Sequence, residues 1–131
     1  MVIDYWLLYL MKLYINTSDR ESIKIGLLSG EKFLIEKVYE AKFRQAEKLL
    51  TGIEKMLATV KVKLSEIEAI EVENRGGGFT SLRIGVITAN ALGFALGIPV
   101  RSVAGGDAEA DGFSIVEAQY SQEPTITISK K

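Results

Sequence analysis

Three segments near the start of the chain combine apolar, strand-forming residues with short polar turns between them. These segments run from Lys12 to Thr17, from Ser22 to Leu28 and from Lys32 to Glu40, and all three are rich in residues that favour strands. Short polar turns separate them, and Ser29-Gly30-Glu31 forms the second turn. Because strands joined by such short turns pair antiparallel, this pattern predicts a three-stranded meander.

The periodicity then changes to that of a helix. Apolar side chains recur every three or four positions and fill one arc of roughly 140° on a helical wheel. These side chains are Phe43, Ala46, Leu49, Leu50, Ile53, Met56, Leu57 and Val60. The sequence therefore predicts an amphipathic helix of about four turns. We expect at least half of its apolar arc to cover the sheet.

A further strand, a second helix and a last strand follow. The expected strands run from Ala69 to Val72 and from Val100 to Val103, and the helix between them runs from Leu82 to Leu96. Gly97 suits the C-terminal cap of that helix, and Pro99 follows at the usual distance. The order β-β-β-α-β-α-β predicts an α/β fold with a mixed five-stranded sheet. This is the layout of one ribonuclease-H-like half-domain of the actin and sugar-kinase superfamily, which hosts kinases, nucleases and scaffolds alike.

Two segments lie outside this predicted half-domain, which spans residues 12–104. Residues 1–11 form an apolar N-terminal extension, which is too short to cross a membrane and is interrupted by Asp4. Residues 105–131 begin as a small, acidic loop and end in Pro124 to Ser129, which alternates like an edge strand. We expect a loop and a short tail strand there, where this superfamily has its second half-domain.

The predicted second helix is apolar on almost every side, because Arg83 is its only charged residue. Such a helix is buried all round, and its own sheet can cover only one face. The other face therefore requires the first helix, another domain or a partner chain. We expect a partner interface formed by Leu82, Gly85, Ala89, Leu92 and Gly93 together with Ala46, Leu49, Leu50 and Ile53 of the first helix. If Ala89 packs on its own sheet instead, the face with Ile87 and Ala91 becomes the expected interface.

Composition narrows the chemistry that the chain can perform. The 131 residues include 16 basic and 17 acidic ones, so there is no overall basic surface for binding nucleic acid unaided. There is no cysteine and no histidine, which removes thiolate metal sites and the usual general base near neutral pH. Asn16 ends the first strand, and an amide cannot act as a carboxylate would. The run Gly76-Gly77-Gly78 lacks the Lys and the Ser or Thr of a phosphate-binding P-loop. We therefore predict no catalytic, cofactor-binding or metal-binding residue.

The stretch from Asn74 to Gly85, NRGGGFTSLRIG, resembles the G-P-G-S-F-T-G-L-R-I-G signature of the TsaB (YeaZ) family. The following ANALGFALGIPV is similar to that family's A-x-G-L-A-L-G-x-P-V, and INTS near the start is similar to its I-D-T-S. The positions that carry this signature are Asn16, Thr17, Ser18, Gly76, Gly78, Phe79, Thr80, Arg83 and Gly85. The chain departs from the family at Asn16, at the glycine that replaces the proline, and in the missing second half-domain. It therefore resembles a shortened member of the family.

This resemblance implies a function. TsaB-like proteins do no chemistry themselves and pair, through their two N-terminal helices, with the homologous catalytic subunit TsaD. With TsaC-type and TsaE-type proteins, TsaD attaches a threonylcarbamoyl group to an adenosine beside the tRNA anticodon. TsaD carries an H-x-x-H metal motif, which a chain without histidine cannot have. The resemblance thus implies a cytoplasmic, non-catalytic scaffold subunit without a cofactor. Its expected partners are a TsaD-like subunit, a TsaE-like ATPase or a second copy, and it would meet tRNA only through the complex.

Two other classes of function are open on the sequence. A small kinase or hydrolase of the same superfold would need clustered carboxylates at its strand ends and a second lobe to close over nucleotide. Glu66, Glu68, Glu71 and Glu73 instead alternate with apolar residues, as on the solvent face of a strand. A homodimeric interaction domain unrelated to tRNA is the other alternative, because an apolar helix face does not name its partner.

Overall fold

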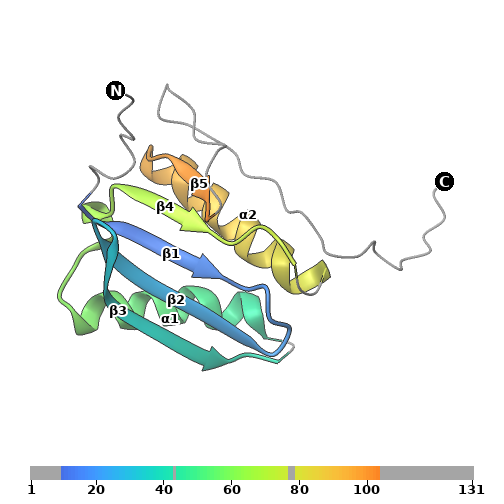
Figure 1. The fold of residues 1–131 in the computed structure, drawn as a ribbon. Helices are drawn as coiled ribbons and strands as arrows, with labels where there is room; N and C mark the ends of the chain where they lie inside the picture. The colour runs from blue at the N-terminus through green and yellow to red at the C-terminus, as the bar shows by residue number, and fades with distance from the viewer. Residues whose placement is uncertain (1–9, 43, 77–78, 104–131) are drawn as a thin grey trace.

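The computed structural model describes residues 10–42, 44–76 and 79–103 (Figure 1). The strands and helices follow one another in the predicted order, with one added 3₁₀-helix. The strands are β1 (Lys12–Asn16), β2 (Ser22–Ser29), β3 (Lys32–Glu40), β4 (Ala69–Val72) and β5 (Val100–Ser102), and the helices are α1 (Gln45–Thr59), η2 (Leu64–Glu66) and α2 (Phe79–Leu96). The predictions for residues 1–9 and 105–131 lie outside the described residues.

The five strands form a sheet in the order β3-β2-β1-β4-β5. β1 lies at the centre, where it pairs antiparallel with β2 and parallel with β4, so that Ile15 is opposite Ile25 on one side and Val72 on the other. β2 pairs antiparallel with β3, and β4 pairs parallel with β5. The predicted meander and the predicted mixed α/β sheet are confirmed.

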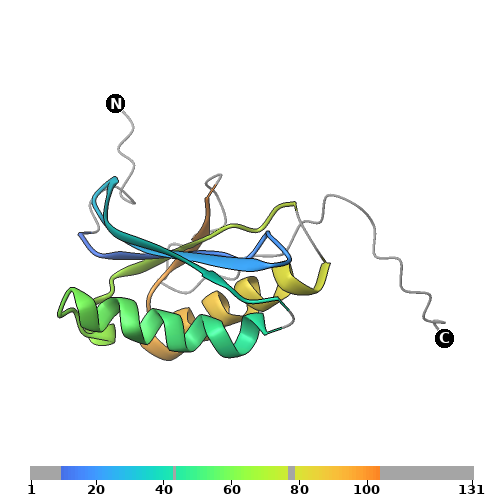
Figure 2. The ribbon, with the colours of Figure 1, turned by 90° about the horizontal axis from the view of Figure 1, so that it is seen from below.

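Both α-helices cover the same face of the sheet (Figure 2). Alternate residues of the strands point toward the helices and are buried, as the period of two requires. The core between the two layers includes Leu13, Ile15, Ile23, Ile25, Leu27, Leu49, Ile53, Met56, Ile70, Val72, Val86, Ala89 and Val100. Each large apolar side chain removed from water in this way stabilises the fold by roughly 1.5–3 kcal/mol. This layer therefore sets the position of both helices.

The C-terminal end of α2 lies where the sequence predicts it, and the N-terminal end does not. The helix begins at Phe79, earlier than the expected start at Leu82, and ends at Leu96 as expected. Gly97 has a φ of +67°, a conformation that glycine adopts without strain. The N–H of Ile98 donates to the carbonyl of Gly93 at 3.0 Å, which closes the helix C-terminus. No helix in the described part of the chain is both long enough and apolar enough to span a membrane.

Candidate protein-interaction surface

Local hydrogen bonds close the end of β1. The amide oxygen of Asn16 accepts the backbone N–H of Ser18 at 2.9 Å and the hydroxyl of Ser18 at 2.7 Å. The amide nitrogen of Asn16 donates to the hydroxyl oxygen of Tyr14 at 3.0 Å. Asn16 and Ser18 therefore shape the turn that follows β1, where the family's aspartate would stand.

Thr17 ties β1 to the start of α2. Its buried hydroxyl donates to the carbonyl oxygen of Ser81 at 2.6 Å and accepts the backbone N–H of Gly85 at 3.1 Å. A Cβ atom at residue 85 would collide with the Thr17 side chain. The two signature residues Thr17 and Gly85 therefore set how closely α2 approaches the sheet.

The other signature positions are more exposed than Thr17 and Gly85, or lie outside the residues that the structure describes. Gly76 has a φ of +89°, which favours glycine in the turn before α2. Thr80 and Arg83 are exposed on α2. Gly78 and the side chain of Phe79 lie outside the described residues.

Acidic side chains around β4 accept hydrogen bonds from backbone N–H groups. Glu66 accepts the N–H of Lys63 at 2.7 Å, and Glu68 accepts the N–H of Leu10 at 3.0 Å. Glu73 likewise accepts the N–H of Arg75 at 3.1 Å. Among the described residues, no group of three or more potential ligand side chains is placed to hold a metal ion. Glu66 and Glu73 thus accept hydrogen bonds within local turns and Glu68 accepts one from a remote segment, roles that their alternation in the sequence did not reveal.

Most of the predicted partner interface is buried inside the domain itself. The buried members are Leu49, Ile53, Leu82, Gly85, Ala89 and Gly93. Gly85 lies against Thr17, and Gly93 lies against Val100 of β5, so closely that a Cβ atom would collide at either position. The predicted assignment of the two faces of α2 is therefore wrong, because the small residues let α2 approach its own sheet rather than a partner helix.

The opposite side of the helices exposes large apolar side chains. On α2, Phe94 is 72% exposed and Ile87 is 55% exposed, with the exposed Ala91 between them. On α1, Leu50 is 52% exposed, and Ala46 one turn earlier is exposed as well. We call these five residues the outer helical face. It contains Ala46 and Leu50 of the predicted interface, together with the alternative pair Ile87 and Ala91.

A groove of about 480 Å³ adjoins this face. It is lined by Leu50, Ile53, Glu54, Leu57, Ala58, Val62, Leu64 and Leu92, which come from α1, α2 and the segment after α1. Apart from Glu54 the lining side chains are apolar, so the groove suits an apolar side chain from another molecule. The structure thus brings three residues of the predicted interface, Leu50, Ile53 and Leu92, together at an accessible hollow.

A charged pair occupies the exposed start of α1. The Arg44 guanidinium donates to the Glu47 carboxylate at 2.9 Å. This hydrogen bond, with the attraction between the two charges, lowers the pKa of Glu47 and raises the pKa of Arg44. Both groups therefore stay charged near neutral pH and keep this end of the helix polar.

Comparisons with known proteins agree with this architecture. Residues 39–129 match the family model described as TsaD: tRNA N6-adenosine threonylcarbamoyltransferase. The uncharacterized protein ML0378 of Mycobacterium leprae is 39% identical over 75 residues, which are 57% of this chain and 21% of that protein. The uncharacterized protein Rv3421c of Mycobacterium tuberculosis is 40% identical over 63 residues, which are 48% of this chain and 30% of that protein. The chain thus spans less than a third of these relatives.

A solved structure extends the comparison to three dimensions. YeaZ from Pseudomonas aeruginosa superposes with a TM-score of 0.65 at 29% sequence identity, over 71% of this chain and 43% of YeaZ. The family model covers more than half of the chain, and the fold is that of YeaZ. The chain therefore belongs to the TsaD family of tRNA threonylcarbamoyladenosine proteins, as a TsaB (YeaZ)-like member.

Proposed function

We propose that this chain is a non-catalytic partner subunit, which pairs with a TsaD-like protein for threonylcarbamoyl transfer to the adenosine beside the tRNA anticodon. The observation that carries the proposal is the outer helical face, where Leu50, Ile87 and Phe94 are each more than half exposed. Large apolar side chains that stay exposed on the side of the helices away from the core are typical of a protein interface.

The energetics of this face favour association. Burying an exposed Leu, Ile or Phe side chain against a partner contributes roughly 1.5–3 kcal/mol each before the costs of association are subtracted. The adjoining groove offers a pocket for one apolar anchor, and such central anchors dominate interface energies. The outer helical face is thus built for a helix or an apolar loop of another protein.

The chemistry of the strand ends supports a role in binding rather than in catalysis. At the end of β1, where a carboxylate would serve as a base or a metal ligand, Asn16 is engaged with Ser18 and Tyr14. Glu66, Glu68 and Glu73 hold backbone N–H groups. The sequence has no histidine to act as a general base near neutral pH.

The identity of the partner rests on the family. A TsaD-like catalytic subunit in the cytoplasm is the proposed partner, a TsaE-like ATPase could join the same assembly, and tRNA would be reached only through the complex. Since the chain spans only part of its relatives, the activity of the whole assembly belongs to this proposal as well.

The test measures pairing with a TsaD-like protein from the same source by size exclusion and calorimetry. We expect Ile87→Glu and Phe94→Glu each to weaken pairing about a thousandfold or more, because an unpaired charge buried at an interface costs several kcal/mol. Leu34→Glu is the matched control, since Leu34 is 53% exposed and belongs to β3 rather than to either helix. Unchanged pairing in both helix variants would contradict the proposal. Self-association of the unmodified chain that the same two variants abolish would favour the homodimeric alternative.

A further inference from the structure

The groove beside the outer helical face has one charged residue in its lining. Leu50, Glu54 and Ala58 line it at successive turns of α1, and Leu92 lines it from α2. The other lining residues are apolar as well, so Glu54 is the only lining side chain that can carry a charge. A single carboxylate therefore stands at the edge of an apolar hollow.

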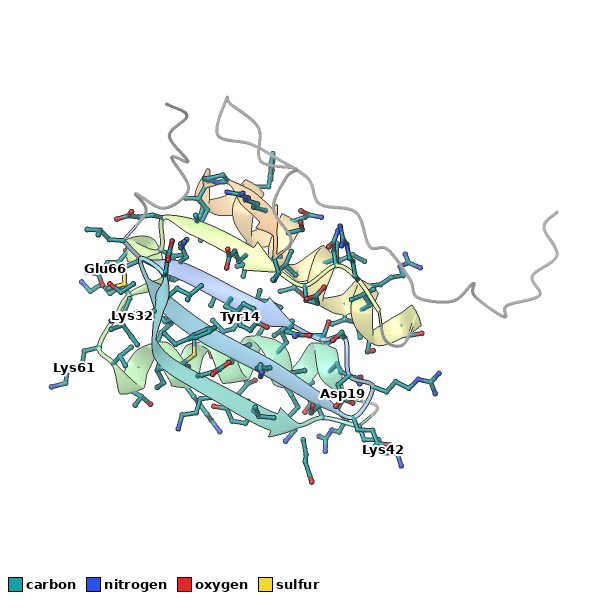
Figure 3. The ribbon with its side chains drawn as sticks, in the orientation of Figure 1. Tyr14, Asp19, Lys32, Lys42, Lys61 and Glu66 are labelled. Carbon is teal, nitrogen blue, oxygen red and sulfur yellow. The ribbon has the colours of Figure 1, made fainter. Side chains whose placement is uncertain are left out.

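Hydrogen bonds after α1 hold the end of this groove in place. Lys61 has a φ of +58° where the chain turns, and Figure 3 shows its side chain pointing outward from this turn. The N–H of Val62 donates to the carbonyl of Leu57 at 3.0 Å. The carboxylate of Glu66 then accepts the N–H of Lys63 at 2.7 Å. A hollow that is already formed in this way receives a side chain at a lower cost in lost freedom.

The carboxylate of Glu54 has no counter-charge within the described part of the chain. It makes no hydrogen bond or ion pair with another described residue. Glu47, two turns earlier on α1, is instead held by the Arg44 guanidinium at 2.9 Å. The positions three and four residues from Glu54 on α1 are Leu, Thr, Leu and Ala, so the helix offers no cation at pairing distance. The negative charge at the groove is therefore open to a cation from another molecule.

This charge restricts what can cover the groove. A covering molecule removes water from the carboxylate, and burying an unpaired charge is costly. A cation from the same molecule offsets that cost, and opposite charges across a contact also favour the correct partner over others. A purely apolar occupant leaves the carboxylate unpaired, and an acidic one is repelled by it. The best occupant is thus apolar with a positive charge beside it.

We propose that the groove takes an apolar side chain that has a lysine or arginine beside it, with the cation pairing to Glu54. The inference rests on the proposed function in one respect, since the occupant that we assign is a segment of the TsaD-like partner. Glu54 is then the residue that makes this site selective. The outer helical face supplies the apolar contacts around it.

Charge substitutions at Glu54 test its role in pairing. Calorimetry with a TsaD-like protein from the same source compares Glu54→Gln and Glu54→Lys with the unmodified chain. We expect pairing to weaken about tenfold in Glu54→Gln, where the cation loses its counter-charge, and about a hundredfold in Glu54→Lys, where it meets a like charge. Glu31→Lys is the matched control, because Glu31 is exposed in the turn between β2 and β3 and its net-charge change is the same. Since Glu54 is also exposed, all three variants should melt like the unmodified chain.

The outcomes separate this inference from the proposed function. If Ile87→Glu weakens pairing and Glu54→Lys does not, the outer helical face is a partner surface but the role of Glu54 is refuted. An equal loss in Glu31→Lys would also refute it, because net charge alone would explain the effect. Self-association of the unmodified chain that Glu54→Lys abolishes would assign the groove to a second copy and overturn the choice of occupant.

A pair of small molecules tests the groove without a partner protein. Octylamine and octanoate have similar apolar tails and carry opposite charges near neutral pH. In NMR titrations of the full chain, we expect octylamine to shift the signals of Leu50, Leu57 and Leu92 and to bind about fivefold or more tightly than octanoate. Glu54→Gln should remove this difference, and Glu31→Gln should retain it. Equal affinities of the unmodified chain for the two molecules would overturn the proposal. If the chain does not pair with the TsaD-like protein, the proposed function fails, and this titration still decides what the groove accepts.

Discussion

At the scale of single residues, the hydroxyl of Thr17 makes two buried hydrogen bonds that connect the end of β1 to α2. It contacts a carbonyl and an N–H that belong to Ser81 and Gly85, four residues apart, which is the spacing of a helical hydrogen bond. The hydroxyl thus joins the end of β1 to backbone groups of α2 inside the domain. Gly85 permits the approach, because any side chain there would collide with Thr17.

Replacing Thr17 with Val keeps the shape of the side chain but removes the hydroxyl. We expect the Thr17→Val change to lower the free energy of unfolding by about 1–3 kcal/mol, because two buried backbone groups lose a partner. Thr59→Val is the matched control: its hydroxyl donates to Lys55 at 2.9 Å on the exposed side of α1, and its loss should cost less than about 0.5 kcal/mol. Urea unfolding of both variants measures the difference. Equal losses would show that the Thr17 contact does not position α2.

At the scale of elements, α2 has two apolar faces with different roles. On one face Leu82 and Ala89 have no exposed surface, because this face packs on the sheet. The face with Ile87, Ala91 and Phe94 remains exposed and forms part of the outer helical face. α1 divides more sharply, since its charged residues separate the exposed side from the buried one. The packing of α2 therefore leaves one apolar face of a stable domain available to a partner.

Substitutions at two alanines of α2, one on each face, distinguish the role in folding from the role in pairing. Ala89→Arg puts a cation into the core, and we expect it to destabilise the domain by about 3–5 kcal/mol, enough to unfold much of a domain of ordinary stability. Ala91→Arg puts the same side chain on the exposed face, where the change in stability should stay within about 0.5 kcal/mol while pairing is lost. Thermal melting and size exclusion with a TsaD-like protein measure both effects. A melt that is preserved in Ala89→Arg would mean that the buried face is assigned wrongly.

At the scale of the whole molecule, the described residues form one sheet with helices on one face. Nucleotide sites of this superfold are enclosed between two lobes, so we expect no measurable ATP binding by this chain. Calorimetry with ATP and magnesium should give a dissociation constant weaker than about 1 mM. Asn16→Asp is a useful companion, because a carboxylate can still accept both hydrogen bonds from Ser18 while it restores the family's residue. Micromolar affinity of the unmodified chain for ATP would contradict this prediction and support the kinase or hydrolase alternative.

The sequence by itself determined the order of the strands and helices along the chain, the change to helical spacing and the end of α2. The residues that favour strands between Lys12 and Glu40 predict three strands, and the short polar turns between them favour antiparallel pairing. Gly97 followed by Pro99 stops a helix wherever that helix packs. The family signature was also recognisable from sequence, because Thr17 and Gly85 recur in it as local patterns.

Tertiary structure alone decided which side of α2 is buried. A helix that is apolar all round presents nearly equivalent faces on a wheel, so periodicity carries no information about its orientation. The choice follows from distances to residues remote in sequence, since Gly85 meets Thr17 and Gly93 meets Val100. The role of Glu68 was hidden for a related reason, because the N–H that it accepts belongs to Leu10, which is 58 positions earlier in the chain.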